Sequence, residues 1–141
     1  MHIPGHLAVA LAQHGVIPKS RRQRRLLVVL LVASLFPDIL DKTIGYVLKI
    51  MPNGRHFAHN IFTLIGLSLF AGLIGGKEVG YAWFGGHLGH LLADAKGFVP
   101  WFFPIKRYQF YEGQLTFKPL EIIRETIFLI LTMVFYYFFR R

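Results

Sequence analysis

The sequence predicts an all-α integral membrane helical bundle of about five helices, of which three or four span the bilayer and the first is short or re-entrant. Two observations lead to this prediction. The chain is 54% hydrophobic and 16% aromatic, with a mean hydropathy of +0.46, which is too apolar for a soluble domain of 141 residues. Its apolar runs are separated by short basic stretches, as in multi-pass membrane proteins. We expect a single membrane-embedded domain over residues 1–141.

The formal net charge of +9 raises the alternative of nucleic-acid binding, but the basic residues lie mainly between apolar runs, where they anchor helices at lipid headgroups. They concentrate at Lys19, Arg21, Arg22, Arg24, Arg25, Arg140 and Arg141. This placement disfavours nucleic acid and predicts a cell (inner or plasma) membrane protein with the Lys19–Arg25 side in the cytoplasm. The opposite loops are nearly as basic, so the orientation rests on a small difference, and the oligomeric state stays open.

The first two helices are predicted at about 4–14 and 20–37. Pro4 suits the first turn of a helix, and Gly15 is a natural stop. The first helix is too short to cross a bilayer, which takes about 20 residues. Ser20 suits the N-cap of the second helix, whose apolar stretch ends at Pro37.

The other three helices are predicted at about 60–76, 78–95 and 120–139. The tight link Gly75-Gly76-Lys77 makes the third and fourth helices an antiparallel hairpin, and the fifth ends on Arg140 and Arg141. Two longer loops, 41–55 and 96–119, connect the second helix to the third and the fourth to the fifth. Because consecutive helices alternate in direction, both loops fall at the same end of the bundle.

Metal-capable side chains gather at this end of the bundle. They are His6 in the first helix, Asp38 and Asp41 after the second, His56 and His59 before the third, His90 and Asp94 in the fourth, and Glu121 and Glu125 in the fifth. Ionisable groups at membrane depth are costly unless they are partnered, so their convergence needs a shared reason. The chain has no cysteine, so imidazoles and carboxylates must hold any metal. We predict one to three divalent ions, zinc first, with manganese or iron as alternatives.

His90 and Asp94 are the strongest pair, because their i, i+4 spacing puts both side chains on one helix face. Each candidate also has a simpler interpretation. His90 and Asp94 could form a hydrogen bond that ties two helices, and Asp38 could cap a turn after Pro37. The glutamates suit a helix N-terminus through the helix dipole. The residues alone leave open whether Asp38 or Asp41 is the ligand.

Several short motifs resemble those of a family of small inner-membrane proteins described as metal-dependent hydrolases and also as LexA-binding. The matching strings are Gly5-His6-Leu7-Ala8, Leu35-Phe36-Pro37-Asp38-Ile39-Leu40-Asp41, Arg55-His56-Phe57-Ala58-His59-Asn60, Gly86-His87-Leu88-Gly89-His90-Leu91-Leu92-Ala93-Asp94 and Trp101-Phe102-Phe103-Pro104. Ala58 and Asn60 replace a Thr and a Ser of the family pattern. The second Asp of the Pro-Asp motif lies one residue later than in the commoner version.

The family pattern in turn resembles zinc-dependent phospholipase C and the fungal single-strand nucleases, which use a zinc cluster in a helical bundle. This resemblance implies that His59, His90 and Asp94 surround one metal and that Asp94 can bridge to a second near His6. It also implies that Asp38 or Asp41 holds another metal or orients a water. The second His-x-x-x-Glu ligand set of those enzymes is not evident here, and Glu125 or Glu121 would have to replace it.

We therefore expect a membrane-bound, zinc-type metal-dependent hydrolase that acts on a phosphoester or lipid-headgroup substrate by metal-activated water. The expected metal ligands are His6, Asp38, Asp41, His59, His90, Asp94 and Glu125. Asp38 or Asp41 is the candidate general base. Lys42, Lys96, Lys106 and Arg107 could attract an anionic substrate. The alternative is a non-catalytic membrane protein whose metal or polar site serves partner binding or ion passage.

Overall fold

The computed structural model describes residues 1–18 and 23–140, and this part of the chain is helical without strands. The elements are α1 (Ile3–Val16), α2 (Arg24–Lys42), the π-helix η2 (Thr43–Val47), α3 (Ile61–Gly75), α4 (Lys77–Asp94) and α5 (Pro119–Arg140). The prediction of an all-α fold with five main helices is confirmed.

The predicted membrane spans are not found. Among the described residues, no helix combines the length and the apolar character that crossing a bilayer requires. The most uniformly apolar helix, α3, has 15 residues, whereas a span needs about 20.

The first helix begins as predicted, with Pro4 in its first turn, and continues one residue beyond Gly15. The predicted N-cap Ser20 lies outside the described residues, as do the basic residues Lys19, Arg21 and Arg22. Helix α2 begins at Arg24, and Gln23 occupies its N-cap position.

The prediction that α2 stops at Pro37 is wrong, because the helix runs through this proline to Lys42 and continues into η2. Proline removes one helical N–H donor and crowds the carbonyl four residues earlier, which here is Ala33. The helix tolerates these local costs because α2 packs along both α1 and α4. Asp38 and Asp41 therefore lie on a helix and not in a loop.

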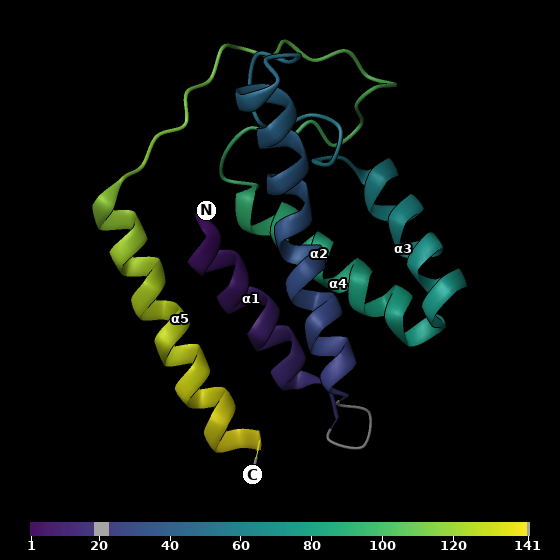
Figure 1. Cartoon of the computed structure of the whole chain (residues 1–141), viewed down its shortest axis with the longest axis vertical. Coiled ribbons are helices and arrows are strands. Elements are labelled where there is room, and N and C mark those ends of the chain that lie inside the picture. Colours follow the sequence, from purple (N-terminus) through teal and green to yellow (C-terminus); the bar gives the residue numbers. More distant parts are fainter. Residues whose placement is uncertain (19–22, 141) are drawn as a thin grey trace.

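The predicted hairpin of the third and fourth helices is present. Helix α3 ends at Gly75 and α4 begins at Lys77, with Gly76 between them at a φ of 89°, a conformation that favours glycine. Asn60 caps α3 by accepting a hydrogen bond from the Thr63 amide. The two helices pack against each other, as Figure 1 shows.

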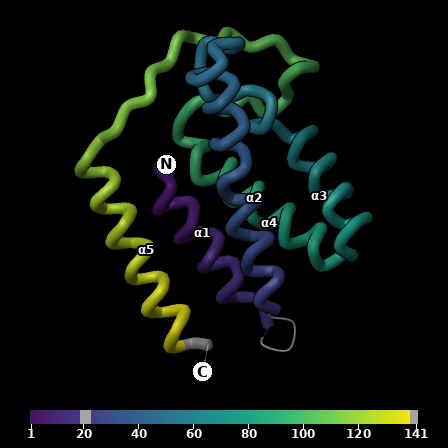
Figure 2. Tube along the Cα trace, in the orientation of Figure 1, coloured from purple at the N-terminus to yellow at the C-terminus, as the bar shows by residue number. Residues whose placement is uncertain are grey.

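Helix α4 lies at the centre of the molecule, where it packs against α1, α2 and α3. Helix α5 packs against α1 on one side of the molecule (Figures 1 and 2). Gly86 lets α2 and α4 approach closely, because a Cβ at this position would lie 2.5 Å from the Leu30 carbonyl oxygen. This close contact brings the second half of α2 beside the second half of α4.

Large apolar side chains remain exposed along α3 and α5. Leu73 of α3 and Leu120 of α5 are 85% and 80% exposed, and many of their neighbours exceed half exposure. By contrast, much of the buried interior is polar and includes six histidines. Extended apolar surface of this kind marks contact with lipid or a partner.

Candidate metal centre

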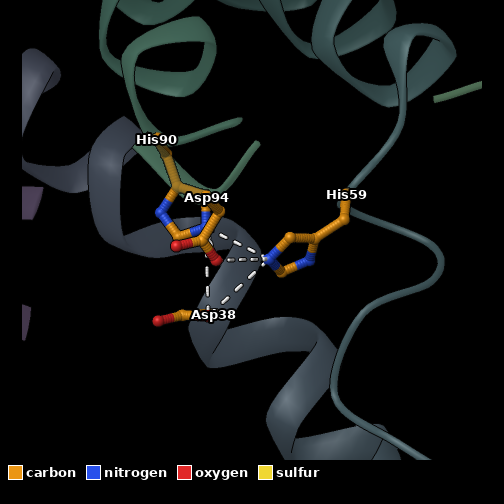
Figure 3. A group of neighbouring side chains, drawn as sticks. All are labelled: Asp38, His59, His90 and Asp94. Carbon is orange, nitrogen blue, oxygen red and sulfur yellow. Dashed lines mark hydrogen bonds and ion pairs between the residues drawn. The ribbon is translucent and has the colours of Figure 1, made fainter. Parts of the chain in front are cut away.

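Four buried side chains converge where α2, α4 and the loop before α3 meet (Figure 3). Asp38 comes from α2, His59 from the loop, and His90 and Asp94 from α4. One ligand atom from each lies within 4.8 Å of the others, and each residue is at most 4% exposed. These residues form a buried Asp/His cluster that could hold a metal ion.

The two histidines of the cluster point bare nitrogens at each other. His90 Nδ1 lies 2.7 Å from the Ser34 carbonyl oxygen, which only accepts hydrogen bonds, so Nδ1 carries the proton. His59 Nδ1 likewise lies 2.8 Å from Asp41 Oδ2. In neutral rings both Nε2 atoms are then unprotonated, yet they lie 3.1 Å apart. Two facing lone pairs repel unless a cation lies between them.

The distances within the cluster suit a metal ion. Asp38 Oδ1 lies 3.7 Å from His59 Nε2 and 3.9 Å from His90 Nε2, and Asp94 Oδ2 lies 3.9 and 4.0 Å from the same two atoms. Bonds of about 2.0–2.1 Å in a tetrahedral site separate ligand atoms by about 3.3 Å. Asp38 Oδ1 is also buried without a hydrogen-bond partner. The donor set and spacing therefore fit a divalent cation after small movements.

Electrostatics keeps His90 in the form that binds metals. Burial, together with the neighbouring imidazoles of His6 and His59, lowers the pKa of His90 well below its usual range. The ring is therefore neutral at physiological pH. A neutral imidazole with Nδ1–H directed at a backbone carbonyl is the usual arrangement of a metal-bound histidine.

Asp41 lies behind His59 and outside the group of four ligand atoms. Its carboxylate accepts backbone N–H bonds from His56, Ala58 and His59 as well as the bond from His59 Nδ1. Burial would raise the pKa of Asp41, but these hydrogen bonds, led by that of His59, lower it below its ordinary value. Asp41 is thus an ionised carboxylate that fixes the orientation and tautomer of His59.

Two further buried histidines hold the loop that carries His59. His87 Nε2 donates to the Ala58 carbonyl over 2.8 Å, and His56 Nε2 donates to the Asn53 carbonyl over 2.5 Å within the loop itself. Burial lowers the pKa of His87 to about 4, so this ring is neutral. His87 was not among the expected ligands, although its i, i+3 spacing to His90 indicates that the two side chains share a face of α4.

His6 contacts the cluster from α1. Its ring is fully buried and stacks on the His90 ring, with 3.9 Å between centroids. His6 Nε2 lies 3.6 Å from Asp94 Oδ1 and 3.9 Å from Asp38 Oδ2, the carboxylate oxygens that are not directed at His59. Both of its ring nitrogens lack hydrogen-bond partners. His6 is therefore available as a further ligand beside the four.

Two basic side chains contact the carboxylates from the solvent side. Lys42 Nζ lies 2.6 Å from Asp38 Oδ2, and Arg55 Nη2 lies 2.7 Å from Asp94 Oδ2. Burial would raise the pKa of Asp94, but the Arg55 guanidinium holds it below its ordinary value. Arg55 was not among the expected site residues, although it opens the string Arg55-His56-Phe57-Ala58-His59-Asn60 that resembles a family motif.

The predicted glutamates lie apart from the cluster. Glu125 is buried and accepts backbone N–H bonds from His2 and Gly5 at the start of α1, a common partner for unpaired helix N–H groups. Glu121 pairs with Lys118 in an exposed i, i+3 contact. The structure does not bring either glutamate to the four ligand atoms.

Comparison with models of known protein families gives a match for this chain. A family model described as YdjM inner membrane protein matches residues 1–141. The chain belongs to this family. Membership implies association with a lipid bilayer, which agrees with the exposed apolar side chains of α3 and α5. No curated protein and no solved structure matches the chain, so nothing supports the resemblance to zinc-dependent phospholipase C and single-strand nucleases.

Proposed function

We propose that this YdjM-family protein is a metal-dependent hydrolase of the inner membrane that uses metal-activated water on a phosphoester. One observation carries the proposal: the unprotonated Nε2 atoms of His59 and His90 lie 3.1 Å apart, beside two buried carboxylates that pair with cations. This donor set of two imidazoles and two carboxylates suits zinc first, and manganese or iron next. A bound divalent ion supplies Lewis acidity toward water and a phosphoryl oxygen.

The chain's own residues have distinct parts in this proposal. His59, His90, Asp38 and Asp94 hold the ion, and His6 is the further ligand within reach. Asp41 acts through His59 as a positioning residue, because its oxygens are taken up by hydrogen bonds from the loop. Asp38 is the better of the two candidate bases, because it lies at the centre: its Oδ1 is directed at the ion, and its Oδ2, which pairs with Lys42, is the oxygen that would accept a proton.

The alternative is a non-catalytic membrane protein with a structural metal site. It is favoured by one observation: the four clustered side chains alone would complete a tetrahedral shell, and closed shells are typical of structural zinc. Hydrolysis instead requires a coordination position for water, either as a fifth ligand beside the four side chains or in place of one of them. The open position would face Lys42 and Arg55, which pair with the two carboxylates and also line a cavity.

Elemental analysis of the protein purified in detergent without chelator is the first test. We expect about one or more zinc, manganese or iron ions per chain, and loss of most of that metal in Asp94→Ala. Glu78→Gln is the control, because Glu78 is exposed in the first turn of α4, at the opposite end of the helix from Asp94. A wild-type protein that retains no metal under these conditions contradicts the proposal.

Turnover of bis-p-nitrophenyl phosphate and of phospholipid substrates then separates the two functions. The hydrolase proposal expects wild-type activity that Asp94→Ala lacks and Glu78→Gln keeps. A metal-loaded wild type with no more activity than Asp94→Ala on every substrate favours the structural site.

A further inference from the structure

A cavity of about 660 Å³ has in its wall Lys42 and Arg55, the two side chains that pair with the carboxylates of the metal centre, and its volume is within the range of about 300–1,000 Å³ typical of small-molecule sites. We call it the Lys42–Arg55 cavity. Its walls come from the start of α1, the end of α2 with η2, the loop 53–55, the segment 113–118 and the start of α5. In Figure 1 the green segment that leads into α5 passes over this end of the molecule.

Hydrogen bonds fix the wall that the segment 113–118 provides. The Gly113 amide donates to the Pro52 carbonyl over 2.9 Å, and Asn53 Nδ2 donates to the Tyr111 carbonyl over 3.0 Å. These bonds tie the long connection before α5 to the loop that precedes His59. The cavity is therefore held by the same loop that positions the centre.

Lys42 and Arg55 belong to both the cavity and the centre. Both line the cavity, and they contact Asp38 and Asp94 respectively. Their side chains are 35% and 29% exposed, whereas the carboxylates are nearly inaccessible. Arg55 is held at the rim by a second bond, from Nη1 to the Phe98 carbonyl. A divalent ion would neutralise the two carboxylates and leave these cations to bind an anion in the cavity.

Most of the remaining cavity wall is apolar. It includes Ile3, Phe98, Leu115, Phe117 and Ile122, of which Phe117 is 72% and Leu115 47% exposed. Lys118, the other lysine in the wall, pairs with Glu121. The anion-binding groups thus lie at the end next to the centre, and exposed apolar side chains line the rest. A free phosphate would leave these side chains uncovered.

From this arrangement, and resting on the proposed hydrolase function, we infer that the substrate is a phosphate group carried on an apolar chain. Its phosphate binds between Lys42 and Arg55 beside the metal centre. Its apolar chain covers Leu115, Phe117 and their neighbours. A phosphate borne by a membrane lipid has this chemistry, whereas inorganic phosphate and a nucleotide have only the anionic part.

Binding to the metal-loaded protein tests the inference without relying on turnover. Calorimetric titration would compare n-octyl phosphate with inorganic phosphate, adenosine monophosphate and the uncharged n-octyl glucoside. We expect n-octyl phosphate to bind at least about tenfold more tightly than each of the others, because it alone engages both parts of the cavity.

Substitutions separate the two parts. Phe117→Gln and Leu115→Gln are expected to weaken n-octyl phosphate about tenfold and to leave inorganic phosphate unchanged. Arg55→Gln is expected to weaken both phosphates. Phe70→Gln on α3 is the matched control, because Phe70 is similarly exposed, at 60%, and lies outside the cavity wall. Far-ultraviolet circular dichroism and metal content verify that each variant is folded and loaded.

Three outcomes overturn the inference while leaving the metal centre intact. They are equal affinity for octyl and inorganic phosphate, tighter binding of adenosine monophosphate, and octyl phosphate binding that Phe117→Gln and Leu115→Gln leave unchanged. A protein that takes up no metal overturns the proposed function itself, and this inference with it.

Discussion

At the scale of single residues, the centre depends on which ring nitrogen carries a proton. His59 and His90 direct Nδ1–H toward Asp41 and the Ser34 carbonyl, so that both Nε2 atoms face inward. Ser34 directly follows Ala33, whose carbonyl has no helical N–H donor because Pro37 lacks one. The chemistry of the site therefore rests as much on the residues behind the histidines as on the histidines themselves.

Asp41→Asn tests this dependence. The substitution keeps the size of the side chain but removes the charge that orients His59 and stabilises its N–H. We expect metal affinity to fall about 10- to 100-fold, measured by competition titration against a chromophoric chelator. His2→Ala serves as the control, since His2 lies outside the cluster. An affinity equal to that of the wild type would show that Asp41 is not a positioning residue.

At the scale of elements, two helices and one loop make the centre. Helix α2 supplies Asp38, α4 supplies His90 and Asp94, and the loop before α3 supplies His59. The distance between α2 and α4 is set by close contacts such as that of Gly86 with the Leu30 carbonyl and Ala33. Because interiors are tightly packed, pushing these helices apart also separates Asp38 from Asp94.

Gly86→Ala tests the helix contact. The new Cβ would lie 2.5 Å from the Leu30 carbonyl oxygen, a backbone atom that cannot move without shifting α2. We expect a loss of about 1–3 kcal/mol in the free energy of unfolding, measured by denaturant titration, and weaker metal binding.

Gly66→Ala is the matched control for Gly86→Ala, because Gly66 also lies in a helix and its Cβ would meet nothing within 4 Å. This change should stabilise the protein by about 0.4–1 kcal/mol, because alanine lowers the conformational entropy of the unfolded chain and has a higher helix propensity than glycine. If Gly86→Ala behaves like Gly66→Ala, the two helices do not depend on close contact.

At the scale of the whole molecule, an unusually polar interior is combined with an apolar exterior. The buried residues include His6, His56, His59, His87 and His90 alongside four acidic residues. The large apolar side chains of α3 and α5 lie outside, and membership of an inner-membrane family implies association with a lipid bilayer. Buried charges without a full set of partners destabilise a fold, so a bound cation should contribute to global stability.

Metal removal tests this contribution. Chelation should lower the unfolding temperature of the detergent-solubilised protein, because an ion that binds only the folded state at 100 times its Kd adds about 2.7 kcal/mol. Differential scanning calorimetry with and without chelator, followed by re-addition of zinc, measures the change. His59→Ala should unfold at the same temperature under both conditions. No effect of chelator on the metal-loaded wild type would contradict a stabilising centre.

Much of this protein follows from its sequence. Apolar runs, Pro4 and Gly75-Gly76-Lys77 predict the helices α1, α3 and α4 to within a few residues. Alternating helix directions also predict that histidines and aspartates gather at one end of the bundle. The predicted end of α2 at Pro37 is wrong, because it rests on a local rule about proline. Packing of α2 against α1 and α4 outweighs the cost of one lost hydrogen bond.

By itself the sequence determined the all-α class and the residue types at the metal-capable end, because apolar runs, turn residues and composition are properties of neighbouring residues. Only the tertiary structure decided between Asp38 and Asp41. The two residues lie one turn apart on α2, and the loop that carries His59 folds over Asp41 through hydrogen bonds from His56, Ala58 and His59. Those contacts cross more than a dozen residues of chain, so no local pattern encodes them. They leave Asp38 as the carboxylate that faces the centre.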